Sequence, residues 1–226
     1  MVQYFKIYGQ KRTGTNYVAS LITQSFMNVN VYMNVGGWKH GPIIEFPNSY
    51  NLLNTVDKKT AQGINKNKTI ELFKNKEIYF IVTIKNPYMW MYSISQFENK
   101  KLNESYIISK IKEWNTNYLN YKTYIEQNKA YLIKYEDIIQ DQKKIFQDMK
   151  NRFGIEIYNA DIDIVYKLLP NNDNDLGKTS KKQFDKTKYI QPNISNYLSK
   201  DSIRIINKTI DTSLLNFYNY SIQKVE

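Results

Sequence analysis

The chain has 226 residues and contains no cysteine, which excludes disulfide bonds, thiolate catalysis and thiolate metal sites. Its length suits one globular domain spanning residues 1–226. A formal net charge of +11 favours anionic partners such as a nucleotide, a nucleic acid, an acidic glycan or a membrane surface. A general enrichment of the sequence in Lys and Asn, unrelated to any partner, would account for the charge equally well.

The first half of the chain alternates strand-like and helix-like segments. Residues 2–9 are rich in aromatic and β-branched residues and end at Gly9, which predicts a buried strand. Apolar residues at helical spacing then predict a helix over 14–26. A second strand is predicted over 29–35, followed by a loop over 36–47. The N-terminus lacks a signal-peptide pattern and no long apolar run follows, so we expect a cytoplasmic protein without a membrane span.

The second half continues the alternation with longer elements. We predict strands over 77–85 and 129–135, and helices over 86–98, 103–127, 136–154 and 199–217. A polar, basic loop is predicted over 169–189. Strands that alternate with helices predict an α/β fold: three layers, α/β/α, with a mostly parallel central sheet, like that of the P-loop NTPases.

The loop between the first strand and the first helix resembles a Walker phosphate loop but departs from it. Gly9 and Gly14 have the Walker spacing, but the position after the second glycine is Thr15 where a Walker loop has lysine. Two cations, Lys11 and Arg12, lie inside the loop. Because the Walker lysine contacts the β and γ phosphates, its absence disfavours a metal-assisted nucleoside triphosphate site.

The loop nevertheless has the groups that an anion site needs. A glycine loop that enters a helix presents several backbone N–H groups and the positive end of the helix dipole. Gly14 allows close approach of the backbone, and Thr13, Thr15 and Asn16 carry side-chain donors. Arg12 can make a two-point contact with a tetrahedral anion.

A second stretch, "IKNPYMWMYSISQF" over 84–97, also lies where a buried strand meets a helix. Lys85 ends the strand and Ser93 follows eight residues later. From a strand end and the next helix, both side chains could reach one phosphate at the carboxyl edge of the sheet, where open α/β sheets bind ligands.

In these two stretches, the chain resembles the sulfotransferases that use 3'-phosphoadenosine 5'-phosphosulfate (PAPS). Their first loop, [KR]-[ST]-G-T-[TS]-[WL], corresponds to "RTGTNY" over 12–17, and their R-[ND]-P-x(5)-S-x-x-x-[FY] motif to "KNPYMWMYSISQF" over 85–97. "YLIKYEDII" over 131–139 and the closing helix over 197–220 follow in the family's order. The resemblance implies that residues 11–17 hold the 5'-phosphosulfate, that Lys85 and Ser93 hold the 3'-phosphate, and that no metal is needed.

Several positions depart from the family pattern. The arginine of the second motif is Lys85 here, a point charge instead of a planar fork, and the usual acidic residue two after the proline is Met89. Asn16 replaces a common Thr or Ser. The family's basic C-terminal segment has no clear counterpart, and residues 175–186 are the best candidate. That segment adds three candidate 3'-phosphate or lid contacts, which are Lys178, Lys181 and Lys182.

The resemblance also implies catalytic roles. Arg12 takes the place of the cation that stabilises the leaving phosphate, and Lys11 is the neighbour that could substitute for it. An acceptor hydroxyl needs a base, and His40, the only histidine, has an imidazole suited to this at neutral pH. Glu45 is the alternative base if its surroundings raise its pKa. Each cation, like His40, could instead be a solvated loop residue.

Aromatic and acidic residues near these motifs have two interpretations each. Tyr17 takes the position whose ring lies near adenine in the family, but core packing would explain it equally well. Trp38 could wall an acceptor pocket, although loop packing is the simpler interpretation. Tyr135 is expected near the nucleotide. For Glu136 and Asp137, we favour a structural role at a helix start over acid–base chemistry.

Three other functions remain open from the sequence. A nucleotide or small-molecule kinase with a degenerate loop would bind ATP with Mg²⁺. A nucleic-acid-binding protein would fit the charge, but no recognised motif supports it, so we expect no nucleic-acid partner. A catalytically inactive family member would bind only the nucleotide. The sequence identifies neither the acceptor, for which a saccharide is one candidate, nor the oligomeric state.

Overall fold

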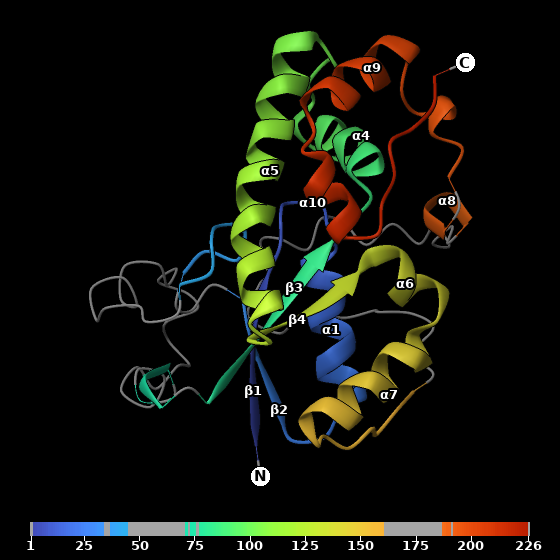
Figure 1. The fold of residues 1–226 in the computed structure, drawn as a ribbon. Coiled ribbons are helices and arrows are strands. Elements are labelled where there is room, and N and C mark those ends of the chain that lie inside the picture. The colour runs from blue at the N-terminus through green and yellow to red at the C-terminus, as the bar shows by residue number, and fades with distance from the viewer. Residues whose placement is uncertain are drawn as a thin grey trace.

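A computed structural model describes residues 2–33, 37–44, 71, 73–75, 77–160, 187–190 and 192–225. Within these residues, the strands form one parallel sheet in the order β2-β1-β3-β4 (Figure 1). Parallel strands place all their carboxyl ends at one edge, which is where both predicted anion-binding loops begin. The strands are β1 (Gln3–Tyr8), β2 (Val29–Tyr32), β3 (Ile78–Ile84) and β4 (Ala130–Lys134).

Helices cover both faces of the sheet and define two separate cores (Figure 1). One core joins the sheet to α4 (Pro87–Glu98), α5 (Glu104–Glu126), α9 (Lys200–Thr209) and α10 (Thr212–Phe217). The other joins it to α1 (Thr15–Ser25) and α7 (Gln142–Phe153). The shorter elements are α6 (Tyr135–Gln140), α8 (Thr187–Ile190) and the 3-10 turn η2 (Ile194–Asn196).

Alternation along the strands explains the two cores. Phe5 and Ile7 of β1 point into the core with α1, whereas Tyr8 points into the core with α5. On β3, Ile81 points into the core with α1 and Val82 points into the core with α5. The predicted three-layer α/β fold with a parallel sheet is therefore confirmed for the described residues.

The ends of several elements follow local signals in the sequence. Asn103 accepts a hydrogen bond from the Tyr106 amide at 2.9 Å and so caps α5, and Gly154 ends α7 in the left-handed conformation with φ 63°. β2 ends at Tyr32, shorter than the predicted strand over 29–35, of which residues 34 and 35 lie outside the described residues. Among the described helices, none combines the length and the apolar character needed to cross a membrane.

Two segments that were each predicted to form one helix form two helices, so these predictions were wrong. The segment 136–154 divides at Asp141, whose carboxylate accepts from the Lys144 amide at 3.0 Å and caps α7. The segment 199–217 divides at Asp211, which caps α10. In both cases an aspartate side chain accepts hydrogen bonds from the free backbone amides at the start of a new helix. The spacing of apolar residues does not reveal such a break.

We expect Asp211→Ala to lower the free energy of unfolding by about 1 kcal/mol, the usual loss on removing a helix N-cap. The Asp211 carboxylate accepts from the amides of Ser213 at 2.8 Å and Leu214 at 3.1 Å. Urea unfolding measures the change. Asp201→Ala is the control, because it removes an exposed ion pair with Arg204 and a carboxylate in the first turn of α9 but no capping hydrogen bond, and should cost less than Asp211→Ala. Equal losses in the two variants would contradict the capping role.

The same cap predicts a pH dependence. The hydrogen bond from Ser213 is the main cause that lowers the pKa of Asp211 in the folded chain. A carboxyl whose pKa is lowered by folding contributes stability above its unfolded pKa of about 3.9, and this contribution is lost as the pH falls through the folded pKa. The stability difference between the wild type and Asp211→Ala should therefore shrink below about pH 4.

Candidate active site

The loop over 9–14 leaves β1 and enters α1 at the carboxyl edge of the sheet. Gly14 precedes the helix in the left-handed conformation with φ 86°, and a Cβ atom there would lie 2.4 Å from Cδ2 of Tyr135. Arg12 is also left-handed, with φ 69°. The loop thus turns sharply at two points and presses its backbone against the Tyr135 ring, and only glycine fits at the second point.

Side chains from β3 and α4 hold the loop in place. The Thr13 hydroxyl donates to the Gln10 carbonyl at 2.7 Å and lies 2.9 Å from the hydroxyl of Thr83, at the end of β3. The Trp90 indole on α4 donates to the Lys11 carbonyl at 2.8 Å. These buried contacts fix the loop backbone before any ligand arrives, which favours a preorganised anion site.

The turn over 37–44 packs against the start of the loop and brings His40 to it. The Gly9 amide donates to the Lys39 carbonyl at 2.9 Å, and His40 Nδ1 lies 2.7 Å from the Gly9 carbonyl oxygen. A carbonyl oxygen only accepts hydrogen bonds, so Nδ1 carries a proton and Nε2 is the basic atom of the neutral ring. The structure thus places His40 at the same sheet edge as the loop.

Lys39 is a second residue of this turn that touches the site. Its side chain is buried, and Nζ donates to Oδ1 of Asn16, in the first turn of α1, at 2.7 Å. An ammonium group therefore lies beside the helix N-terminus even though Thr15 replaces the Walker lysine. Lys39 was not predicted, and the only signal for it in the sequence is its position next to His40.

The second motif starts α4 through a side-chain cap. Asn86 Oδ1 accepts from the amides of Tyr88 at 3.0 Å and Met89 at 3.4 Å, and Pro87 occupies the first turn. The Asn86 amide donates to Oε1 of Glu136 at 2.8 Å. The order Asn-Pro after a strand thus sets the direction of α4 and, with it, the position of Ser93.

Lys85 brings the two motifs together. It is only 4% exposed, and its Nζ lies 3.3 Å from the Ser93 hydroxyl oxygen and 3.5 Å from the Arg12 carbonyl oxygen. β1 and β3 are neighbours in the sheet, so the loop that follows each one reaches the same edge. The structure therefore brings Lys85, Ser93 and the backbone of Arg12 together at one edge of the sheet.

Two tyrosine rings enclose the Lys85 ammonium group. Nζ lies 4.4 Å from the ring centre of Tyr135 and 4.3 Å from that of Tyr189 on α8. Tyr17 meets Tyr135 edge to face, with ring centres 6.0 Å apart. Tyr17 and Tyr135 were expected near the nucleotide, whereas Tyr189 was not predicted, because it follows a long polar segment without a motif. Its ring lies against the ammonium group of Lys85, which is only 4% exposed.

Glu136 has the structural surroundings that the sequence suggested. It lies in the first turn of α6, and Oε2 accepts from the Tyr220 hydroxyl at 2.8 Å while Oε1 accepts from Asn86. Burial raises its pKa, although the nearby charge of Lys85 opposes that rise. The carboxylate joins the starts of α4 and α6 to the C-terminal segment.

The two loop cations lie over exposed aromatic rings. Lys11 Nζ is 5.6 Å from the centre of the Trp38 ring, and the Arg12 guanidinium carbon is 5.2 Å from the centre of the Phe97 ring. Trp38 is 51% exposed and Phe97 is 58% exposed. Both cations can therefore swing toward a bound anion without losing a buried partner.

Some predicted residues fall outside the described part of the chain. These are Glu45 and the three lysines of the predicted C-terminal loop, Lys178, Lys181 and Lys182. Within the described residues, no group of three or more His, Asp or Glu side chains could hold a metal ion.

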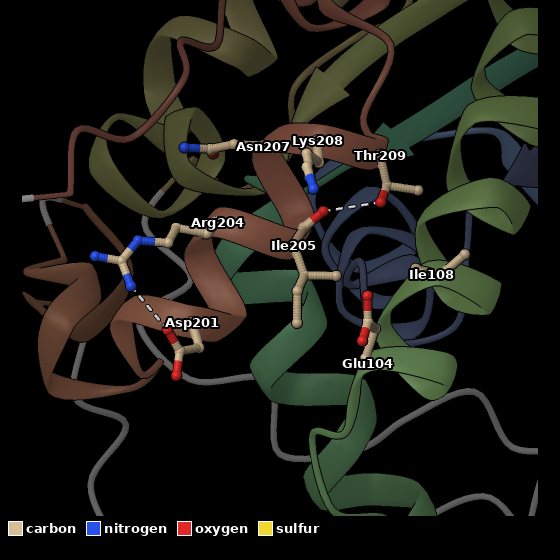
Figure 2. Close-up of a pocket in the computed structure, with 8 residues that line it drawn as sticks. All are labelled: Glu104, Ile108, Asp201, Arg204, Ile205, Asn207, Lys208 and Thr209. Atoms are coloured by element: carbon tan, nitrogen blue, oxygen red, sulfur yellow. Dashed lines mark hydrogen bonds and ion pairs between the residues drawn. The ribbon is translucent and has the colours of Figure 1, made fainter.

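A hollow of about 630 Å³ lies between α5 and α9, and none of the predicted site residues lines it (Figure 2). Its lining includes two carboxylates, Glu104 and Asp201, and two cations, Arg204 and Lys208, of which Asp201 and Arg204 pair at 2.8 Å. This balance of charge would not attract a polyanionic nucleotide, in contrast to the lysine- and arginine-rich loop.

Comparisons with known proteins give little further information. No protein-family model matches the chain, and no curated protein matches it. Among solved structures, the chain is similar to the sulfotransferase domain from the Synechococcus PCC 7002 olefin synthase, with 11% sequence identity and a TM-score of 0.48. The likeness covers 99% of this chain and 96% of that one. A likeness at this level is no evidence of function, which must be argued from the chain's own residues.

We expect Gly14→Ala to destabilise the fold more than Gly154→Ala does. Both glycines are left-handed, which costs an alanine about 1 kcal/mol. The added Cβ would also collide with Tyr135 at position 14, but it meets nothing within 4 Å at position 154. Urea unfolding of both variants measures the difference, and equal losses would show that the Tyr135 contact is unimportant.

We expect Tyr189→Ala to expose Lys85. Acetylation of Lys85 by a small amine-reactive ester, followed by peptide mass spectrometry, should be several-fold faster than in the wild type. Tyr189→Phe keeps the ring and should react like the wild type. If Tyr189→Ala reacts at the wild-type rate, the ring does not control access to the ammonium group.

Proposed function

We propose that the chain is a PAPS-dependent sulfotransferase that moves the sulfuryl group from PAPS to a hydroxyl or amine acceptor. The observation that carries this proposal is the position of Lys85, whose Nζ reaches both Ser93 and the backbone of Arg12. One nucleotide could therefore contact the loop with its 5'-phosphosulfate and the second motif with its 3'-phosphate.

In the transfer step, the bond between sulfur and the 5'-phosphate oxygen breaks and a bond from sulfur to the acceptor oxygen forms. Negative charge develops on the leaving phosphate, where the loop amides, Arg12 and Lys11 stabilise it. Lys39, beside Asn16, adds a further ammonium group at the same helix start. The acceptor proton passes to Nε2 of His40, because Nδ1 is held at the Gly9 carbonyl.

The remaining predicted residues have proposed roles in shaping the loop or in contacting the nucleotide. Thr13 and Gly14 shape the loop, and Thr15 and Asn16 supply donors at the start of α1. Tyr17 flanks the nucleoside next to Tyr135. Lys181 stays a predicted contact for the 3'-phosphate from the segment that the structure does not describe.

A kinase fits the site less well. In a Walker loop, the Ser or Thr that follows the lysine binds Mg²⁺. The corresponding residue is Asn16, and its side-chain oxygen accepts a hydrogen bond from Lys39. A protein cation therefore occupies the place that a metal ion would need.

Thermal shift and calorimetry with adenosine 3',5'-bisphosphate, compared with ATP and Mg²⁺, test the nucleotide assignment. We expect the bisphosphate to bind and Lys85→Ala to weaken it by about ten- to a hundredfold, because a hydrogen bond to a charged group contributes about 1.5–3 kcal/mol. Lys122→Ala removes the same charge from a remote pair with Glu126 and should leave binding unchanged.

Mass spectrometry then tests transfer from PAPS to a panel of glycans, phenols and peptides. His40→Ala should abolish transfer but keep nucleotide binding. Absence of bisphosphate binding at millimolar concentration would end the proposal. Binding without transfer to any acceptor would indicate an inactive nucleotide-binding protein, and preferential binding of ATP with Mg²⁺ would indicate a kinase.

A further inference from the structure

Lys6 is a lysine in the middle of the central strand β1, and its side chain is fully buried, with 0% exposure. Strand positions in a sheet covered on both faces are ordinarily apolar, and lysine is almost never fully buried without partners. Burial strongly lowers the pKa of Lys6, and the charge of Lys39 lowers it further. A lysine at this position is therefore costly unless its amino group has a specific task.

The amino group of Lys6 binds the chain that follows β2. Nζ donates to the carbonyl of Met33 and, at 2.8 Å, to the carbonyl of Gly37, and it lies 4.8 Å from the centre of the Tyr8 ring. Both the ammonium form and the neutral amine have at least two N–H groups, so either form satisfies both carbonyls. The contact thus does not depend on the protonation state of Lys6.

Gly37 is the first residue of the turn over 37–44, which carries the candidate catalytic groups. Two residues later, the Lys39 carbonyl accepts from the Gly9 amide and the Lys39 ammonium group reaches Asn16. His40 follows, with Nδ1 at the Gly9 carbonyl. The turn is therefore held at two points, by Lys6 of β1 and by Gly9 at the start of the loop that follows β1.

We propose that Lys6 is a positioning residue, which fixes Lys39 and His40 against the phosphate-binding loop through the carbonyls of Met33 and Gly37. The role in catalysis rests on the proposed sulfotransferase function, whereas the fixing of His40 does not. Without the two donors, both carbonyls lose their buried partner and the turn must shift to regain one. The Lys6 amino group contacts Met33, Gly37 and Tyr8, so we expect its replacement to leave the 3'-phosphate site at Lys85 and Ser93 intact.

The test compares Lys6→Met with the wild type by two independent measurements. Because His40 is the only histidine, its imidazole protons give a single assignable set of NMR signals in the aromatic region. In Lys6→Met these signals should move toward their positions in the unfolded chain. The kcat for transfer from PAPS should fall by about a hundredfold, as a displacement of about 1 Å in an active site can cause. The Kd for adenosine 3',5'-bisphosphate should change by less than about threefold.

Two further variants separate positioning from a loss of stability. Met149→Ala opens a cavity in the core on the opposite face of the sheet, and it should lower the melting temperature without moving the His40 signals or kcat. The chain has no cysteine, so Lys6→Cys can be alkylated selectively with 2-bromoethylamine in the unfolded state and refolded. This restores an amino group at nearly the length of lysine and should restore both the His40 signals and kcat.

Each outcome decides the proposal. Wild-type His40 signals in Lys6→Met overturn it, even if no variant shows transferase activity. Shifted signals with an unchanged kcat also overturn it, because the fixed turn would then have no part in the reaction. If the wild-type chain binds no bisphosphate and transfers no sulfate, the function fails, while the NMR measurement still decides whether Lys6 holds His40.

Discussion

The buried ammonium group of Lys85 is the contact on which the geometry of the candidate site depends. Lys85 directly follows β3. Its Nζ contacts Ser93 on α4 and the Arg12 carbonyl in the loop after β1, and it lies between the rings of Tyr135 and Tyr189. A buried cation is stable only if its partners stay in place. The parallel pairing of β1 with β3 satisfies this condition, because it brings the two strand ends together at one edge.

The parts of the site that the sequence predicted are those encoded locally. A strand, a glycine loop and a helix follow one another within residues 2–26, and the order Lys85-Asn86-Pro87 ends a strand and caps a helix without help from distant residues. The convergence of the two motifs needed one further rule, that parallel strands share a carboxyl edge. The fold class and the positions of Arg12, Lys85 and His40 could therefore be predicted.

The residues that were missed act across long stretches of sequence. Tyr189 covers Lys85 from a separate short helix, and Lys39 reaches Asn16 from the turn after β2. Neither contact leaves a spacing pattern, because the partners belong to separate segments that meet only in the folded chain. The breaks at Asp141 and Asp211 were missed for a different reason. The apolar residues on both sides of each break keep a helical spacing, and the only local sign of a new helix is the aspartate that caps it.

The cation missing from the position after Gly14 is supplied through space from another segment. A Walker loop carries its lysine on the helix itself, so the helix alone determines where the ammonium group lies. Here Lys39 approaches the helix start from the turn after β2, and its position depends on what holds that turn. Lys6 of β1 and Gly9, the residue that follows β1, provide that support. Loop and turn are thus held together at the carboxyl end of β1, as the proposed roles of the loop cations and of His40 require.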